Sequence, residues 1–247
     1  MRVGILETGK VSDDLRVGHG DFPEMFTRVL GQVDPGIEFF PVRIVSGAGI
    51  PRSPGEADGW IVTGSEHGVY DDLPWIGPMK DFLRRCLAER VPVVGICFGH
   101  QLLAEAMGGR VEKSSHGWKL GVQDYEVVHR PGWMTDLPDR FSVRAMHQDQ
   151  VVEKPEGTTL LATSPTCPYA VLAYGDPEAP LAVTVQPHPE FTAEFLDALI
   201  AARTGDVLPE DLAAEARASL GRPVHTEEWA RWIVDFLRNA AVERASA

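Results

Sequence analysis

The stretch Val91–Ile96 constrains the fold of this chain more than any other. It reads Val-Pro-Val-Val-Gly-Ile, a nearly unbroken apolar run. Such a run is typical of a strand that is buried on both faces, as in a parallel sheet covered by helices. Apolar residues then recur with helical spacing from Leu102 to Met107, and Gly108-Gly109 ends the pattern. The sequence therefore predicts a buried strand that leads directly into a helix.

The first half of the chain alternates further strand and helix patterns. Strands are expected at Val3–Leu6, Ile37–Val42 and Trp60–Thr63. Helices are expected over Phe22–Leu30, with Asp21 as its N-cap, and along the apolar face Met79–Leu87. Strands that alternate with helices in this order favour a doubly wound α/β fold.

The second half has a different pattern, of short strands separated by proline and glycine turns. The expected strands are Gly121–Val128, Ser142–Met146, Leu160–Thr163, Ala170–Tyr174 and Leu181–Val185. A meander of this kind either extends the same sheet or flanks it. Helical patterns at Phe195–Ile200 and Trp229–Leu237 close the chain.

The charge and cysteine content exclude several classes of protein. The formal net charge of −13 repels phosphate backbones, which argues against nucleic-acid binding. Three cysteines in 247 residues are too few for a disulfide framework and suit a reducing compartment. The N-terminus does not have the pattern of a signal peptide, and no apolar stretch approaches the length of a membrane helix. We therefore expect a cytoplasmic protein that contacts no membrane.

The segment Gly95-Ile96-Cys97-Phe98-Gly99 joins the buried strand to the following helix. This is the setting of a nucleophile elbow, whose tight turn needs small residues on both sides of the nucleophile. A sulfur at a helix N-terminus gains thiolate character from the helix dipole. The amide of Phe98 would then point toward an oxyanion on the substrate. The pattern predicts Cys97 as a nucleophile.

The alternative for Cys97 is a small buried apolar residue, the usual fate of a free cysteine. Cys86 illustrates that alternative, because it lies on the apolar face of its expected helix. Cys167 lies in a proline-rich segment that is expected to form a turn, and the sequence suggests no role for it.

A base for the thiol is suggested by Gln186-Pro187-His188-Pro189-Glu190, which follows the last expected strand. The prolines favour extended backbone, in which residues two apart face the same side. His188 and Glu190 would then project together, and a carboxylate beside an imidazole fixes its tautomer. The alternatives are a surface salt bridge or part of a metal site. No further ligands stand at zinc spacing, so we expect no metal and no cofactor.

These two motifs together resemble the class I glutamine amidotransferase family, over about Val3 to Ile200. The similarity is to the amidotransferase domain of GMP synthetases and to stand-alone γ-glutamyl peptidases. It implies a flavodoxin-like, three-layer α/β fold with an open, mostly parallel mixed sheet flanked by helices. It also implies a Cys97–His188–Glu190 triad that cleaves a γ-glutamyl amide through a thioester. We predict a family domain over residues 1–203 and a helical extension over 204–247 packed on it.

Two further segments match the family. The segment Thr63-Gly64-Ser65 resembles the loop that gives the second oxyanion donor, at or next to Gly64, although Gly-Gly-Pro is common there in the family. The segment Met146-His147-Gln148 resembles the loop that holds the α-amino and α-carboxylate groups of glutamine. Gln101 matches a position that contacts the substrate. The resemblance thus implies that Ser65, Gln101 and the three loop residues bind substrate.

Three functions stay open from the sequence. The first is glutamine hydrolysis to glutamate and ammonia, with a separate synthetase receiving the ammonia, since the chain has no glycine-rich phosphate loop. The second is a stand-alone hydrolase of γ-glutamyl peptides or amines. The third is a non-catalytic binding module of the same fold. Beside these, a different thiol hydrolase of that fold that acts on an ester or a peptide also stays open. A homo-oligomer is compatible with each of them.

Overall fold

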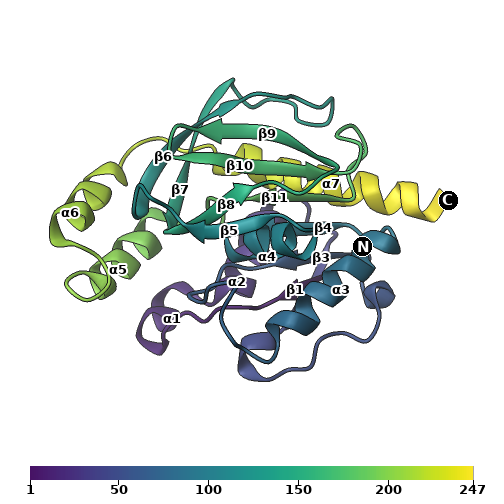
Figure 1. Cartoon of the computed structure of the whole chain (residues 1–247), viewed down its shortest axis with the longest axis horizontal. Helices are drawn as coiled ribbons and strands as arrows, with labels where there is room; N and C mark the ends of the chain where they lie inside the picture. The colour runs from purple at the N-terminus through teal and green to yellow at the C-terminus, as the bar shows by residue number, and fades with distance from the viewer. Residues whose placement is uncertain (247) are drawn as a thin grey trace.

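A computed structural model describes residues 1–246 of the chain. A nine-stranded sheet runs through the molecule in the order β2-β1-β3-β4-β11-β10-β9-β6-β7 (Figure 1). Its first five strands are mutually parallel: β2 (Glu38–Val42), β1 (Arg2–Leu6), β3 (Gly59–Val62), β4 (Val93–Ile96) and β11 (Ala182–Val185). The others are antiparallel to their neighbours: β10 (Cys167–Tyr174), β9 (Thr158–Ser164), β6 (Lys119–Val127) and β7 (Arg140–His147). The predicted mostly parallel mixed sheet is confirmed.

Every strand expected from the sequence is present, and its ends differ by at most three residues from the expected ones. The meander of the second half extends the main sheet and does not flank it. The sequence analysis missed β5 (Arg110–Lys113) and β8 (Asp149–Glu153), which form a separate two-stranded ladder. Their pairing joins the segment that directly follows helix α4 to the second half of the chain.

Helices pack on both faces of the sheet and make three layers (Figure 1). On one face, α2 (Phe22–Val33) and α7 (Thr226–Ser246) pack together and share a core with β1, β4 and β11. On the other face, α3 (Ile76–Ala88) and α4 (Phe98–Ala106) pack on β3, β4 and β10. No helix within residues 1–246 combines the length and the apolar character needed to cross a bilayer.

A third core cluster lies at one end of the molecule. It joins α5 (Ala193–Arg203) and α6 (Glu210–Ser219) to the start of α2 and to Leu120 on β6. The short helix α1 (Asp13–His19) contacts α5. Helix α1 was not expected from the sequence, whereas α6 lies within the helical extension expected over 204–247. Helices α1, α5 and α6 together lie beside the carboxyl ends of the parallel strands.

Helix α2 begins with the capping hydrogen bonds that its sequence predicts. The Asp21 carboxylate accepts a hydrogen bond from the Glu24 amide at 3.0 Å, and the Glu24 carboxylate accepts one from the Asp21 amide at 2.9 Å. This reciprocal pair satisfies two amides that a helix start leaves without partners. The expected N-cap of α2 is therefore confirmed.

The extension predicted over 204–247 contributes to two cores, apart from Ala247, which lies outside the described residues. Trp229 and Trp232 on α7 are buried, and the Trp232 indole donates a hydrogen bond of 2.7 Å to the Thr135 carbonyl. These tryptophans are core residues, as their helical spacing indicates. Helix α6 packs on α5 and β6 instead.

Helix α4 approaches the sheet closely where it begins. A Cβ added to Gly99 would lie 2.5 Å from the Val62 carbonyl oxygen. Real Cβ atoms do not approach backbone this closely, so the glycine permits the contact. The start of α4 can therefore lie directly over the ends of β3 and β4.

Replacing Gly99 with alanine should lower the free energy of unfolding by about 1–3 kcal/mol, because backbone would have to move. Gly31→Ala in α2 is the control, since its added Cβ would meet no atom within 4 Å. That variant should gain about 0.5–1 kcal/mol, because alanine favours helix. Urea denaturation measures both changes. A Gly99→Ala protein as stable as wild type would contradict the close approach.

Candidate active site

Cys97 occupies a strained turn between β4 and α4. Its backbone angles are φ 51° and ψ −99°, a conformation that L-residues seldom adopt and that costs about 1–3 kcal/mol. The Cys97 amide donates a hydrogen bond of 2.8 Å to the Val185 carbonyl at the end of β11. The flanking Gly95 also lacks room for a side chain, because a Cβ would lie 2.7 Å from the Gly99 carbonyl oxygen. The sequence thus folds here as a nucleophile elbow.

His188 and Glu190 meet side by side after β11. The Nδ1 atom of His188 lies 2.7 Å from Oε1 of Glu190, and both side chains are buried. Since a carboxylate only accepts, Nδ1 carries the proton and Nε2 is the nitrogen left for the sulfur. The His188 amide also donates to the Arg144 carbonyl at 2.8 Å. The motif is therefore held by β7 as well as by its own strand.

An aromatic ring fixes the plane of the His188 imidazole. The Phe191 ring stacks on it with centroids 3.9 Å apart and planes 9° apart. The Phe191 carbonyl accepts a hydrogen bond of 3.0 Å from the Arg144 guanidinium. The imidazole is consequently held by its stacking partner and by its hydrogen bond to Glu190.

Neighbouring charges set the protonation of the His188 imidazole. Burial alone lowers its pKa, but the negative charge of Glu190 and the neighbouring Cys97 sulfur, with hydrogen bonds to both, raise it to about 10. The ring therefore carries a proton at neutral pH. An imidazolium that is paired with a carboxylate and lies beside a sulfur can deliver a proton to a leaving group.

Gly64 lies against the imidazole. A Cβ added to it would lie 2.7 Å from Cε1 of His188, so only glycine leaves room for the ring at this distance. The amide of Phe98 is among the first of α4, and such amides have no carbonyl partner within their helix. Of the two residues predicted as oxyanion donors, Gly64 therefore borders His188, and Phe98 follows Cys97 directly in the chain.

Two buried threonines hold the loop that carries Gly64. The Thr8 hydroxyl donates to the Thr63 carbonyl at 3.0 Å, and the Thr8 amide donates to the Thr63 hydroxyl at 3.0 Å. The Ser65 hydroxyl donates to the Thr8 carbonyl at 2.7 Å and accepts from the His67 amide at 3.2 Å. Ser65 lines the cavity, but its hydroxyl is engaged in shaping the loop.

Gln101 and His147 converge on β8. The Gln101 amide donates to the Asp149 carbonyl at 2.8 Å and to the Gln186 side-chain oxygen at 3.2 Å. The His147 Nδ1 atom lies 3.0 Å from the same Asp149 carbonyl, which can only accept, so Nδ1 carries the proton. Burial lowers the pKa of His147 to about 3, and the nearby His188 contributes to the lowering. His147 is therefore neutral beside a charged His188.

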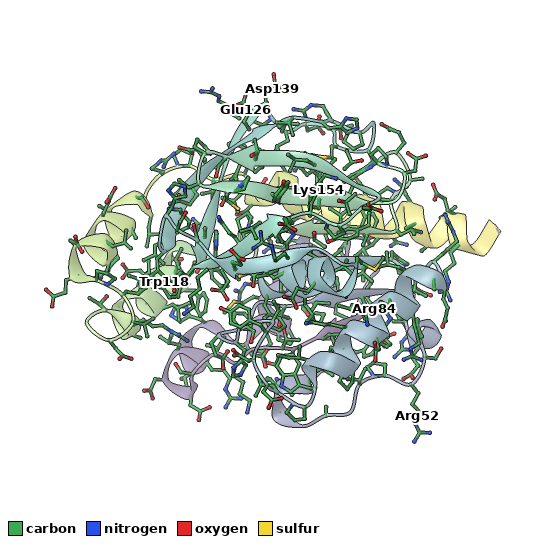
Figure 2. The ribbon with its side chains drawn as sticks, viewed as in Figure 1. Arg52, Arg84, Trp118, Glu126, Asp139 and Lys154 are labelled. Carbon is green, nitrogen blue, oxygen red and sulfur yellow. The ribbon has the colours of Figure 1, made fainter. Side chains whose placement is uncertain are left out.

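Cys97 opens into a cavity of about 430 Å³. It is lined by the predicted residues Ser65, Gln101, Met146, His147, Gln148 and His188. Figure 2 shows one further lining residue, Trp118, on the side of the molecule where α5 lies. The sequence analysis missed the rest of the lining, which includes Val11, Phe22, Tyr70, Phe191, Phe195, Leu199 and Arg203. Phe191 is adjacent to the histidine motif in sequence, whereas the others had no local signal.

A family model for class-I glutamine amidotransferases matches residues 24–204, which is most of the chain. The chain belongs to the class I glutamine amidotransferase family. Both motifs that carry the resemblance lie within the matched range.

Known members of the family differ in how much of their length this amidotransferase chain covers. It is 28% identical to γ-glutamyl peptidase 4 of Arabidopsis thaliana over 232 residues, which is 89% of this chain and 88% of the peptidase. It is 36% identical to the glutamine-hydrolysing GMP synthase of Bacillus subtilis over 132 residues, which is 53% of this chain but 24% of the synthase.

Solved structures share the fold of this amidotransferase. A glutamine amidotransferase from Thermotoga maritima superimposes with a TM-score of 0.76 at 21% identity and covers 98% of both chains. One from Methylobacillus flagellatus gives a TM-score of 0.77 at 22% identity, covering 98% of this chain and 94% of its own. The predicted fold class is confirmed.

The other two cysteines of the amidotransferase are buried away from solvent. Cys86 belongs to α3 and is buried in the core, as expected, and burial raises its pKa to about 12. Cys167 was expected in a turn, but it is the first residue of β10. The Ser164 hydroxyl at the end of β9 accepts a hydrogen bond from the Cys167 amide, so the turn between the two strands ends at the cysteine. Burial likewise raises the pKa of Cys167 to about 12. Both thiols stay protonated at neutral pH.

His100 supports the elbow from inside the fold. Its Nδ1 atom lies 2.7 Å from the Thr184 hydroxyl on β11, and the ring is fully buried. Burial lowers the pKa of His100 to about 3, and the neighbouring His147 adds to the lowering. The ring therefore stays neutral in the folded state well below the pH at which an exposed histidine gains a proton.

Acid should destabilise the protein through His100. Between pH 6.5 and 3 the unfolded state binds a proton that the folded state does not, so stability falls as pH falls. At pH 5 this amounts to about 2 kcal/mol. Between pH 7 and 5, His100→Gln should therefore lose about 2 kcal/mol less than wild type in urea denaturation. The exposed His129→Gln is the control and should behave as wild type. Equal losses in the wild-type and His100→Gln proteins would contradict the assignment.

Proposed function

We propose that this amidotransferase hydrolyses a γ-glutamyl amide with Cys97 as nucleophile, His188 as acid and base, and Glu190 as the carboxylate that orients the imidazole. The observation that carries the proposal is the buried His188–Glu190 hydrogen bond of 2.7 Å, together with a cavity that both Cys97 and His188 line. A thiol is activated by an adjacent general base, and a third group orients that base.

In the first half of the reaction the Cys97 thiolate attacks the γ-carbonyl carbon of the substrate. The carbon–sulfur bond forms, and the carbonyl π electrons move to oxygen to give a tetrahedral oxyanion. We expect amides near Gly64 and Phe98 to stabilise that oxyanion, because Gly64 lies against the His188 imidazole and Phe98 directly follows Cys97. The intermediate then collapses, the carbon–nitrogen bond breaks, and His188 gives its proton to the leaving nitrogen.

In the second half water hydrolyses the γ-glutamyl thioester. His188, now neutral, takes a proton from water as the oxygen attacks the thioester carbon. The carbon–sulfur bond breaks, glutamate leaves, and the thiolate–imidazolium pair is restored. Glu190 stabilises the imidazolium at each stage, because its carboxylate stays hydrogen bonded to Nδ1.

We further propose that the polar side of the cavity binds the α-amino and α-carboxylate groups of the γ-glutamyl moiety. The candidate residues are Ser65, Gln101, Met146, His147 and Gln148, all of which line the cavity. The Gln101–Asp149 hydrogen bond supports this assignment, because it couples α4 to the start of β8, directly after Gln148. Contacts from the Ser65 backbone suit the role better than its engaged hydroxyl.

A stand-alone hydrolase is favoured over a subunit that supplies ammonia to a synthetase. The relatives named γ-glutamyl peptidase match this chain along most of their length, whereas the GMP synthases extend far beyond the matched part. A synthetase partner would instead be indicated if glutamine turnover rose when a candidate synthetase was added.

Cys97→Ala should lower kcat by about 10³-fold or more, because no other group in the cavity can form the thioester. Release of ammonia or amine from glutamine and γ-glutamyl amides measures the change. Cys86→Ala is the matched control, since it removes a buried thiol that lies outside the cavity. The control should keep its turnover. Full activity in Cys97→Ala would refute the proposal, and a non-catalytic module would then be favoured.

Glu190→Gln should lower kcat by about 10²–10⁴-fold and change the pH dependence. Without the carboxylate charge the pKa of His188 falls from about 10, so the imidazolium is lost at lower pH. The alkaline limb of the profile of kcat/KM against pH should therefore move to lower pH. Glu194→Gln, on the exposed start of α5, is the control and should keep the wild-type profile. An unmoved alkaline limb in Glu190→Gln would show that this carboxylate does not govern His188.

A further inference from the structure

The two sides of the cavity differ in chemistry. Its acidic lining residues, Glu66, Asp71 and Asp149, lie on the loop after β3 and at the start of β8. The apolar side of the lining belongs to the third core cluster, with Phe22, Trp118, Phe191, Phe195 and Leu199 among its residues. Glutamine releases only ammonia, which needs no apolar surface. The apolar side therefore exceeds what glutamine requires.

The apolar side begins at His188. Phe191 stacks on the imidazole at 3.9 Å, and Phe195 packs on Phe191 with centroids 4.8 Å apart. A general acid must lie within hydrogen-bond reach of the nitrogen that it protonates. If His188 acts as proposed above, the leaving nitrogen lies beside it. The rest of the leaving group then faces Phe191 and α5.

One face of α5 continues this side of the cavity. Phe195, Leu199 and Arg203 all line it and are spaced by four residues, which places them on the same side of the helix. Eight residues of helix span about 12 Å, so Arg203 lies well beyond Phe195 along the cavity. An apolar strip thus ends at a guanidinium.

Arg203 has no acidic partner in the part of the chain that the structure describes. It is half-buried at the C-terminal end of α5, and no described carboxylate lies within ion-pair distance of it. The acidic lining residues lie in other segments of the chain, on the loop after β3 and at the start of β8. A half-buried guanidinium at the end of an apolar strip is suited to an anionic group, most readily a carboxylate, which it binds through two hydrogen bonds.

We propose that the natural substrate is a γ-glutamyl amide whose leaving amine is extended and apolar and ends in a carboxylate. The apolar part packs on Phe195 and Leu199, and Arg203 binds the carboxylate. The inference rests on the proposed function and adds the substrate class. The chemistry is unchanged: the carbon–nitrogen bond breaks, His188 protonates the amine nitrogen, and the amino acid leaves as a free amine with its carboxylate intact.

Three γ-glutamyl amides test this class, with glutamine as reference. They are the amides of methylamine, of hexylamine and of 6-aminohexanoic acid. The hexylamide should exceed the methylamide and glutamine about tenfold in kcat/KM, because only it covers the apolar strip. The 6-aminohexanoate should exceed the hexylamide by about another tenfold, and added salt should reduce that second preference.

Two variants divide the effect between the strip and the guanidinium. Arg203→Gln should abolish the preference for 6-aminohexanoate over hexylamide, and Leu199→Asn should reduce the preference for hexylamide over methylamide. Arg52→Gln is the matched control and should keep both ratios, since Arg52 projects from the opposite end of the molecule from α5 in Figure 2. Thermal unfolding of each variant checks that it folds. The salt dependence of the wild-type ratio tests the guanidinium should Arg203→Gln fail to fold.

The outcomes separate this inference from the function on which it rests. Cys97-dependent turnover with equal kcat/KM for the methylamide and the hexylamide would overturn the apolar subsite. A carboxylate preference that Arg203→Gln leaves unchanged would overturn the role of Arg203. Failure to cleave any of the four compounds, or full turnover in Cys97→Ala, would instead refute the proposed function itself.

Discussion

The close packing of helix α4 on the sheet determines where the side chains of the site lie. The turn at Cys97 holds an unfavourable backbone conformation, and it persists only because α4 lies directly on β3, β4 and β11. Gly95 and Gly99 make that contact possible, since a side chain at either position would overlap backbone. The amide of Cys97 is tied to β11, which also leads to His188. The same packing therefore fixes both the position of Cys97 and its distance from His188.

The charges of the site are buried and depend on one another. Oε1 of Glu190 accepts from His188, whereas its Oε2 has no hydrogen-bond partner among residues 1–246. A buried carboxylate without compensation is costly, so the protonated imidazole and the carboxylate stabilise each other. His147 next to them is held neutral, which avoids a second positive charge beside His188. Of these two buried histidines, only His188 therefore carries a positive charge at neutral pH.

Sequence patterns predicted the features that depend on local chemistry. The apolar run Val91–Ile96, the glycines around Cys97 and the prolines around His188 each specify a backbone form, and the strands and the buried His188–Glu190 contact agree with them. The short strands β5 and β8 were missed because their residues are mostly polar and pair only with each other. Cys167 was misjudged because the prolines beside it indicated a turn, whereas the strand begins at the cysteine itself.

The apolar side of the cavity could not be predicted, because its residues come from segments far apart in the sequence. Phe22, Trp118 and Leu199 reach one another only after α2, β6 and α5 have packed into the third core cluster. Helical spacing marked Phe195 and Leu199 as an apolar face, but that pattern does not distinguish a face against a core from one against a cavity. Arg203 had no pattern at all, since a single cation at a helix end is common.

The position of β11 in the sheet has a consequence for how the chain reaches its native state. β11 separates β4 from β10, and its contact with β4 joins residues 93–96 to residues 182–185. Contacts between such distant segments are slow to form, and the open edges of unpaired strands favour aggregation until they do. On the ribosome, β4 and its cysteine emerge long before the strand that completes the sheet. Cys97 thus exists in the nascent chain without His188 and Glu190, and these residues meet only when the last central strand is inserted.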